Sequence, residues 1–238
     1  IQSAASNCCS LLLHFHDYCA ERYFDFVALD EAAAESDALL FLGCYDYILK
    51  KMPLTKPCVG LEMHNSYNGL MSTIALDPLN AAEKACAFFR KNGYGKVKIL
   101  SESDRDGFPQ MPVYNFRQTA FADMWRNYGK LEIIRDQSPV RIELVAEADC
   151  AYFFISDTEY NRLAKAYRDH FGTYLVDDRC VLSVDGKSLM LPGYEPINTI
   201  AVDWKEMGVI ALEECIRRID NPGTSSRRIY QDCHIKEC

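Results

Sequence analysis

Short apolar runs alternate with longer amphipathic stretches along most of this chain. Eleven runs have the length and composition of strands, at Leu11–Phe15, Phe26–Leu29, Ala38–Gly43, Cys58–Glu62, Thr73–Leu76, Lys96–Leu100, Leu131–Ile134, Ala151–Ile155, Cys180–Val184, Thr199–Val202 and Arg228–Tyr230. Strands that alternate with helical segments are typical of βαβ units, in which helices cover a parallel sheet. The pattern therefore predicts an α/β protein with doubly wound parallel sheets.

Four of the intervening stretches carry the boundary signals of helices, such as an N-capping aspartate or a terminal glycine. They predict one helix between Asp77 and Gly93 and others over Val113–Tyr128, Asp157–Phe171 and Asp203–Ile219. In the second of these helices, Phe116, Ala120, Phe121 and Met124 are expected to point inward. The aperiodic segments Ser101–Pro112 and Gly186–Pro196 are expected to be loops at the rim of a sheet, where ligands usually bind.

Composition places the chain among globular proteins. It has 238 residues, of which 49% are hydrophobic and 25% charged, and a formal net charge of −8. Because an acidic chain is repelled by phosphate backbones, DNA contact by these residues is not expected. The apolar runs are far shorter than the roughly 18 residues that a membrane span needs. We therefore expect a soluble protein of one large domain or two lobes.

No pattern for a metal, a cofactor or a catalytic nucleophile stands out. The eleven cysteines show no CxxC spacing, so we expect reduced, mostly buried thiols in a cytoplasmic protein. His14 and His16 fall on the same face of a strand and could share a metal, but a third ligand is not evident, so a plain strand is the preferred reading. Glu102, Asp104 and Asp106 suggest a calcium loop, but the closing glutamate is missing, and a solvated acidic loop is preferred.

Several segments, taken in order, resemble the effector-binding core of the LacI/GalR family of bacterial transcription regulators. Asp37–Gly43 is similar to the family's DGIIL strand, and Lys56–Glu62 is similar to its PVVxxD strand. Residues 76–99 resemble the unit that runs from DN to GHRRIA. Arg117–Phe121 resembles RxxGF with an alanine in place of the glycine, and Ala151–Asp157 resembles AVFCxND.

The C-terminal third carries the most specific part of the resemblance. Val181–Asp185, Pro196–Ile200 and Asp203–Ala211 are similar, in order and nearly in spacing, to VVGFDD, PLTTV and D..EMG..A. Ser183 replaces the glycine that the family has two residues before the aspartate. The resemblance covers the chain from Asp37 to the C-terminus.

The resemblance implies a periplasmic-binding-protein-like fold. Two similar α/β lobes would be joined by a three-crossover hinge, with the ligand held between them. By comparison with the family, the N-terminal lobe comprises residues 1–77 and 199–222, and the C-terminal lobe comprises residues 78–198 and 223–238. Ligand binding at the carboxyl edge of parallel strands and hinge closure are also what this architecture favours on physical grounds.

Five residues are implicated in ligand binding by their positions in the family pattern. Arg117 stands at the arginine that grips ligand hydroxyls or a carboxylate, as a guanidinium fork can. Asp185 stands at the strand-end aspartate that accepts hydrogen bonds from ligand hydroxyls; a structural salt bridge is the alternative for both. Glu62 stands where an aspartate is usual and Ser156 where an asparagine is usual. Asp157 either contacts ligand or caps its helix.

The resemblance implies a sensor rather than an enzyme. A homodimeric, cytoplasmic domain of a transcription regulator would bind a small-molecule effector, a sugar or sugar derivative in preference to a purine. It would act on operator DNA only through a helix-turn-helix upstream of Ile1. Effector binding would shift the equilibrium between DNA-competent and incompetent states. The alternatives are a solute-binding protein of a sugar transport system and an enzyme on a doubly wound fold.

Overall fold

The chain folds into two compact units, each built around its own sheet. The computed structural model describes residue 10 and residues 26–42, 55–64, 69–102, 112–136, 141–187 and 192–238. One unit comprises residues 1–75 and 203–231, and the other comprises residues 76–202 and 232–238. The chain passes between the units three times. The family comparison assigned residues 223–231 to the C-terminal lobe and residues 199–202 to the N-terminal lobe. Both assignments are wrong, because the strand at 228–231 joins the first sheet and the strand at 199–201 joins the second.

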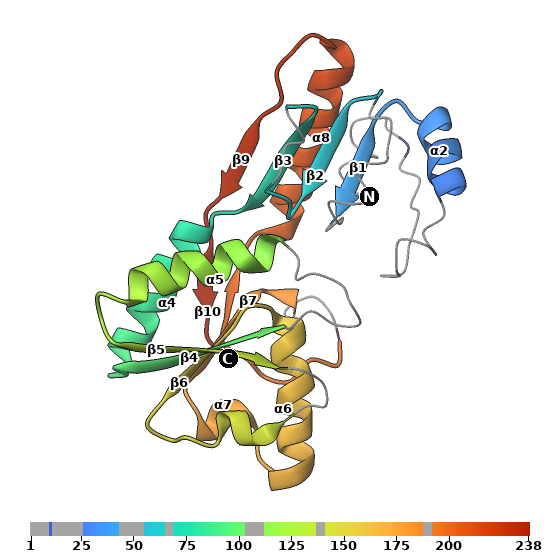
Figure 1. Ribbon diagram of the computed structural model, residues 1–238. Helices are drawn as coiled ribbons and strands as arrows, with labels where there is room; N and C mark the ends of the chain where they lie inside the picture. Colours follow the sequence, from blue (N-terminus) through green and yellow to red (C-terminus); the bar gives the residue numbers. More distant parts are fainter. Residues whose placement is uncertain are drawn as a thin grey trace. The chain divides into compact units, whose positions relative to one another are not determined.

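The first unit is organised around a four-stranded sheet (Figure 1). Its strands follow the order β1 (Leu39–Leu42), β2 (Cys58–Leu61), β3 (Met71–Leu76) and β9 (Arg228–Gln231). Strands β1, β2 and β3 are parallel, and β3 is buried along its whole length. Helix α8 (Trp204–Asp220) packs against β1 and β2, and helix α2 (Phe26–Glu35) precedes β1.

A buried carboxylate ties α8 to the first sheet. Glu214 accepts a hydrogen bond from Ser72 on β3 at 2.6 Å and two from Arg217, one turn along α8, at 2.6 and 2.7 Å. Arg218 donates to the carbonyls of Cys58 and Leu70, both 2.8 Å away. Charge-assisted hydrogen bonds of this kind satisfy groups that would otherwise be costly to bury.

This carboxylate predicts an acid-sensitive contribution to the stability of the first unit. Burial acts to raise the pKa of Glu214, but the hydrogen bonds from Arg217 and Ser72 outweigh it and hold the pKa below its ordinary value of 4.5. A lowered folded-state pKa stabilises the fold above pH 4.5, and this stabilisation is lost as the pH falls through the folded-state value. Glu214→Gln should therefore flatten the fall of the urea midpoint on acidification. Asp220→Asn on the same helix should not; equal slopes in all three proteins would contradict the assignment.

The second unit contains a six-stranded sheet with the order β10-β8-β7-β6-β4-β5. The strands are β4 (Lys96–Glu102), β5 (Lys130–Asp136), β6 (Ala151–Phe154), β7 (Val181–Asp185), β8 (Thr199–Ala201) and β10 (His234–Lys236). All are parallel to their neighbours except β10, which is antiparallel to β8. The chain builds outward from β4 to β5 and then returns to add β6 on the opposite side. Strand order thus reverses between β4 and β6, and ligands of such sheets bind where the order reverses.

Helices cover both faces of this sheet, as Figure 1 shows. Helices α4 (Pro78–Lys91) and α5 (Pro112–Trp125) lie on one face, and α6 (Asp157–Phe171) and α7 (Leu175–Asp178) lie on the other. Alternate residues of a strand point to opposite faces. Accordingly Phe153 of β6 packs on Phe121 of α5 with ring centroids 4.5 Å apart, while Phe154 meets Tyr160 of α6 at 5.2 Å.

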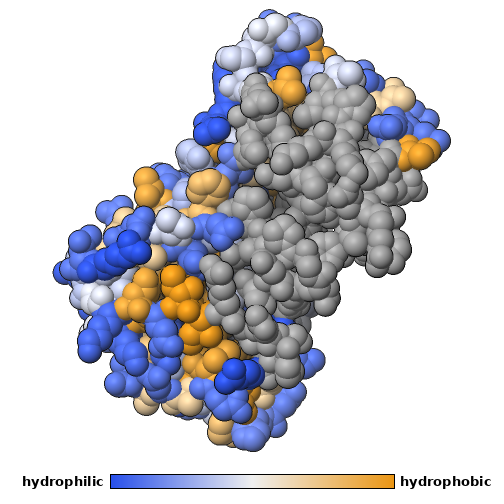
Figure 2. All heavy atoms as spheres, in the orientation of Figure 1, coloured by the Kyte–Doolittle hydropathy of each residue, from blue (hydrophilic) through white to orange (hydrophobic). Residues whose placement is uncertain are grey.

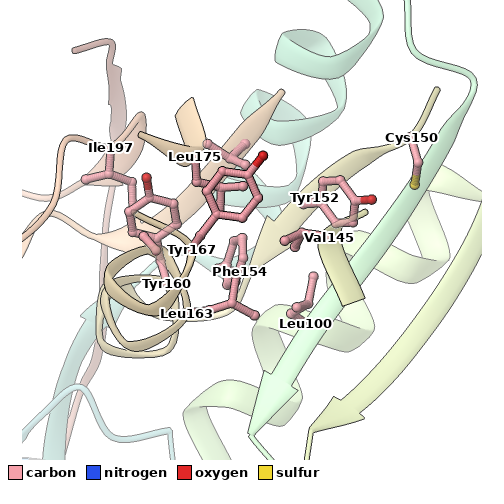
Figure 3. Close-up of a cluster of buried hydrophobic side chains, with 12 residues drawn as sticks. Leu100, Val145, Cys150, Tyr152, Phe154, Tyr160, Leu163, Tyr167, Leu175 and Ile197 are labelled. Atoms are coloured by element: carbon pink, nitrogen blue, oxygen red, sulfur yellow. The ribbon is translucent and has the colours of Figure 1, made fainter. Parts of the chain in front are cut away.

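The face under α6 carries an apolar cluster (Figure 3). Side chains from β4, β6, β7, the short 3-10 turn Ile142–Val145 and helices α6 and α7 meet there, and all twelve members are buried. Two tyrosines place their hydroxyls at its margin, where Tyr152 donates to the carbonyl of Glu147 at 2.8 Å and Tyr160 to that of Pro196 at 2.6 Å. Buried tyrosines need such partners.

The face under α4 and α5 carries an aromatic cluster. Phe89, Phe121, Trp125 and Phe153 are at most 1% exposed. Phe89 meets each of the other three edge-on at 6.0–6.1 Å, and Phe121 stacks on Trp125 at 5.8 Å. Edge-to-face and offset arrangements are favourable for aromatic rings. In Figure 2, a further group of hydrophobic residues reaches the visible surface of the lower part of the picture, among hydrophilic ones.

Two predictions about elements are wrong, and some short elements were not predicted. Phe26–Leu29, expected to be a strand, begins helix α2, whose sequence continues into Ala32–Ala34 and Glu35, residues that favour a helix. Phe116, expected to face inward, is 50% exposed, because the buried face of α5 follows a different stripe. Strand β10 and helix α7 lie where no element was expected. The run Leu11–Phe15, with His14 and His16, and most of the acidic loop Glu102–Gly107 lie outside the described residues.

The described cysteines are all free thiols. Cys58, Cys86, Cys150, Cys215 and Cys233 are buried, as expected, whereas Cys180 is partly exposed and Cys238 exposed. The part of the chain that the structure describes holds no cluster of three or more side chains suited to a metal. Within that same part, no helix is both long and apolar enough to cross a bilayer.

Candidate ligand-binding site

The candidate site begins with a charged residue on the buried face of α5. Val113, Phe121 and Trp125 are spaced by four or eight residues and are buried against the sheet. Arg117 falls in the same stripe and is 3% exposed. Because residues four apart on a helix share a face, the sequence forces the guanidinium inward, where it must find partners.

Arg117 finds those partners at the carboxyl ends of two strands. Its Nη1 donates to the carbonyl of Ile155, just after β6, at 3.0 Å. The same nitrogen lies 2.6 Å from Oδ1 of Asp185, the last residue of β7, whose side chain is 4% exposed. Arg117 therefore joins α5 to β6 and β7 beside the point where strand order reverses.

Lys187 completes this cluster on its more accessible side. Its Nζ lies 2.9 Å from Oδ2 of Asp185, and its side chain is 31% exposed. Burial acts against the charged ammonium, but the carboxylate of Asp185 outweighs it and raises the pKa of Lys187 above its ordinary value. One carboxylate thus faces a cation on each of its oxygens.

The backbone at Asp185 is held in an unusual conformation. Its φ is 127°, a value that residues other than glycine rarely adopt. Hydrogen bonds hold the backbone directly after Asp185. Gly186 N donates to Oγ1 of Thr199 at 3.2 Å, and that hydroxyl donates to Oδ1 of Asp157 at 2.8 Å. Ser183 also donates to Oδ1 of Asp157. Strained residues of this kind concentrate at functional sites.

Ser156 and Asp157 have structural roles at the start of α6. Ser156, and not Asp157, is the N-cap, and it accepts a hydrogen bond from the backbone N–H of Glu159 at 3.3 Å. Asp157 is fully buried, and its contacts with Ser183 and Thr199 tie α6 to β7 and β8. These two side chains therefore support the end of the sheet on which Asp185 stands.

Tyr114 borders the cluster one turn before Arg117. The guanidinium carbon lies 5.7 Å from the centroid of the tyrosine ring, within range of a cation–π contact. Burial, followed by the negative charge of Asp185, raises the pKa of Tyr114 to about 12, and a hydrogen bond from Ser156 opposes the shift. The hydroxyl consequently stays protonated at physiological pH and can donate or accept.

Comparison with solved structures identifies the architecture. The Cra transcriptional dual regulator from Pseudomonas putida, solved in complex with fructose 1-phosphate, aligns over 99% of this chain and 90% of its own, with a TM-score of 0.72 and 15% identity. A LacI family transcriptional regulator from Enterococcus faecalis with bound ribose aligns over 89% of this chain and 80% of its own, with a TM-score of 0.66 and 14% identity. A periplasmic binding protein/LacI transcriptional regulator from Alkaliphilus metalliredigens, complexed with D-xylulofuranose, aligns over 89% of this chain and 80% of its own, with a TM-score of 0.65 and 15% identity.

The chain has the LacI-type fold. This is the periplasmic-binding-protein-like architecture of the effector-binding core that the motifs suggested. No family model matches the sequence, and no curated protein is similar enough to match. Identities of 13–15% with solved structures establish the fold and leave the activity to be argued from the site.

On the LacI-type fold, four of the five expected residues fall in the second unit. Arg117 and Asp185 contact each other directly, and Ser156 and Asp157 lie at the start of the neighbouring helix α6. Glu62 belongs to the first unit, directly after β2, where it is 8% exposed and has a φ of 52°. Glu62 and Asp185 are the two described residues other than glycine with a positive φ, and each follows or ends a parallel strand.

Two members of the site escaped sequence reasoning, Tyr114 and Lys187. Tyr114 is three residues before Arg117 on one helix, a spacing that brings side chains together. Lys187 is two residues after Asp185, beyond a glycine with a φ of 68°. The helical spacing in the sequence could have identified Tyr114. It could not have identified Lys187, because the direction of the chain after Asp185 depends on the backbone conformation of Asp185.

Proposed function

We propose that this chain is the ligand-sensing domain of a LacI-type transcriptional regulator and that it binds a sugar or a similar small polar metabolite. The observation that carries the proposal is the Arg117–Asp185–Lys187 cluster at the carboxyl edge of the second sheet. Its guanidinium, carboxylate and ammonium are the groups that recognise hydroxyls and acidic substituents. Solved proteins of the same fold carry sugars or a sugar phosphate.

The proposed mechanism is a shift in population rather than catalysis. A ligand that binds one conformation of the regulator better than another changes their ratio by its difference in affinity. The domain would act as a homodimer, and DNA contact would belong to another segment of the regulator, since these 238 residues carry a net charge of −8. None of the residues proposed for the site has the role of a nucleophile or a general base here.

A solute-binding protein of a sugar transport system is the second candidate, because one structural neighbour is named as both a periplasmic binding protein and a regulator. The two roles share a fold and a ligand class. They differ in that only the regulator's affinity for operator DNA, measured with the full-length protein, changes when ligand is added.

Ligand binding is tested by thermal unfolding in the presence of sugars, sugar phosphates, sugar acids and purines. A specific ligand at about 100 times its Kd stabilises the protein by about 2.7 kcal/mol, which raises Tm in proportion to the logarithm of its concentration. Arg117→Lys keeps the positive charge but loses the planar guanidinium with its paired N–H donors, so it should weaken ligand binding about tenfold or more. Arg126→Lys, at an exposed position directly after the end of α5, should bind as the unaltered protein does. The proposal fails if no compound in these classes raises Tm.

A further inference from the structure

The Arg117–Asp185–Lys187 cluster depends on a turn of the backbone directly after β7. Asp185 has a φ of 127° and Gly186 a φ of 68°, and the ammonium of Lys187 then lies 2.9 Å from Oδ2 of Asp185. A peptide unit is planar, so its orientation sets ψ of the residue before it and φ of the residue after it together. The position of Lys187 relative to Asp185 therefore depends on how the peptide plane between Asp185 and Gly186 is turned.

Thr199 of β8 holds that peptide plane. The N–H of Gly186 donates to Oγ1 of Thr199 at 3.2 Å, and this hydroxyl donates in turn to Oδ1 of Asp157 at 2.8 Å. A hydroxyl that donates to a carboxylate is a better acceptor, because hydrogen bonds in a chain polarise one another. Thr199 and Asp157 are both fully buried, where such hydrogen bonds are costly to lose. These two bonds use none of the three side chains of the cluster.

This independence matters because a ligand would loosen other contacts that fix the turn. A ligand that binds Arg117, Asp185 and Lys187 competes with the ion pairs that these side chains form with one another. A positive φ at a residue other than glycine persists where the surroundings fix it. The hydrogen bond to Thr199 fixes the backbone in the free and in the bound protein alike. A site that is ordered in advance binds more tightly, because less order has to be created on binding.

We propose that Thr199 is a positioning residue of the ligand site, whose hydroxyl orients the Asp185–Gly186 peptide so that Asp185 and Lys187 face the ligand together. This inference rests on the proposed sensing function and adds to it a residue that does not touch the ligand. Without the hydroxyl, the peptide can turn to other orientations, and the affinity falls with the fraction of molecules that keep the binding geometry. A purely structural Thr199 would lower stability and leave the affinity of the folded protein unchanged.

Ser183 provides a matched control for Thr199. Both hydroxyls are fully buried and donate to Oδ1 of Asp157, and that of Thr199 in addition accepts from the N–H of Gly186. Thr199→Val replaces the hydroxyl by a methyl group, Ser183→Ala removes the other hydroxyl from the same carboxylate, and Thr199→Ser keeps a hydroxyl at position 199. Urea unfolding measures the stability of each variant, so that all are compared under conditions in which they are folded.

The first readout is the backbone amide of Gly186, observed by NMR without any ligand. Isotope labels on aspartate carbonyls and glycine amides mark the two Asp–Gly pairs of the sequence, Asp106–Gly107 and Asp185–Gly186, and Asp106→Glu assigns them. Hydrogen exchange at Gly186 should become about tenfold or more faster in Thr199→Val and should stay within about twofold in Ser183→Ala and Thr199→Ser. Equal acceleration in Thr199→Val and Ser183→Ala would reveal a general loosening around Asp157 and would overturn the inference.

The second readout is the affinity for ribose, fructose 1-phosphate, gluconate and adenine, one compound from each class screened above, measured by isothermal titration calorimetry on the whole chain. For a compound that binds, Thr199→Val should weaken binding about tenfold or more. Ser183→Ala should bind within about twofold of the unaltered protein, and Thr199→Ser should recover most of the loss.

The outcomes distinguish this inference from the function on which it rests. If a compound binds Thr199→Val as tightly as the unaltered protein, or if Ser183→Ala weakens binding as much, Thr199 is not a positioning residue although the sensing function stands. The same holds if exchange at Gly186 rises in Thr199→Val while the affinity is unchanged, because the ligand then does not need the turn. If none of these compounds binds to the unaltered protein, the inference fails together with the proposed function.

Discussion

Asp185→Asn is expected to destabilise the second unit by about 3–5 kcal/mol, the cost of breaking a buried ion pair from one side. The side chains of Arg117 and Asp185 are 3% and 4% exposed, so water cannot replace the lost carboxylate. Lys187 would also lose its partner, which leaves two cations near each other in a poorly hydrated place. The loss should appear as a lower urea midpoint for the second unit.

The two tryptophans make this measurement specific to one unit. Trp125 lies in the second unit and Trp204 in the first, so fluorescence in a Trp204→Phe background reports on the second unit alone. The matched control is Asp123→Asn, which removes an exposed carboxylate of α5 that lies 2.8 Å from Arg126, just after the end of that helix. Exposed pairs contribute little, and the control should change stability by less than about 1 kcal/mol. A similarly small change in Asp185→Asn would mean that the pair is hydrated.

Phe121→Ala is expected to cost about 3–5 kcal/mol, the range for deleting a buried phenyl ring. Phe121 is fully buried and contacts Phe89, Trp125 and Phe153, with centroids 6.0, 5.8 and 4.5 Å away. These three neighbours lie on two helices, α4 and α5, and on strand β6, so they cannot easily move into the space, and most of the cavity would remain. Because Phe121 stacks on Trp125, the fluorescence spectrum of the folded protein should change as well.

Phe116→Ala on the same helix supplies the control for this cavity. Phe116 is 50% exposed, so its replacement removes little buried area and should change stability by about 1 kcal/mol or less. Comparable losses of stability in the two variants would show that the effect of Phe121→Ala comes mainly from helix propensity or the unfolded state and not from packing under α5. Urea unfolding monitored through Trp125 measures both variants in the same background.

The fold could be predicted largely from sequence pattern because the central strands of the second unit, β6, β7 and β8, are buried on both faces. Lys96–Leu100, Ala151–Ile155 and Cys180–Val184 are apolar runs between capped helices, and they became β4, β6 and β7 within one or two residues at each end. Helix α6 has the predicted bounds, with Ser156 as its cap and Gly172 in the left-handed conformation at its end. Capping residues and apolar runs suffice to predict an element where they agree with the burial of its side chains in the fold.

One miss has a local cause in the sequence, and the others occur where tertiary context decides. The run that begins at Phe26 fits a strand over four residues, but the alanines that follow it favour a helix, and the longer segment prevailed. His234–Lys236 is too short to be recognised as a strand until β8 is known to offer an antiparallel edge. The inward stripe of α5 was misjudged because Arg117 was not counted as a core position, although Val113, Phe121 and Trp125 place it there.

The residues of the candidate site likewise fall into those that the sequence indicated and one that only the structure revealed. Arg117 and Asp185 were implicated by family resemblance, and the structure brings them into contact. Their ligand binding is a proposal. Their pairing explains how the charged side chain of Arg117 can occupy a buried position of α5. Lys187 required the structure, because Asp185 and Gly186 both have positive φ values that turn the chain back over the carboxylate.

The interleaving of the two units affects how this protein can change over evolution. Each unit is assembled from separate stretches of sequence, and β9 and β10 enter different sheets with only Asp232 and Cys233 between them. A recombination event at one crossover would therefore exchange part of each unit and leave incomplete sheets on both sides. Shuffling would need compatible breakpoints at all three crossovers. The two units consequently have to be inherited together.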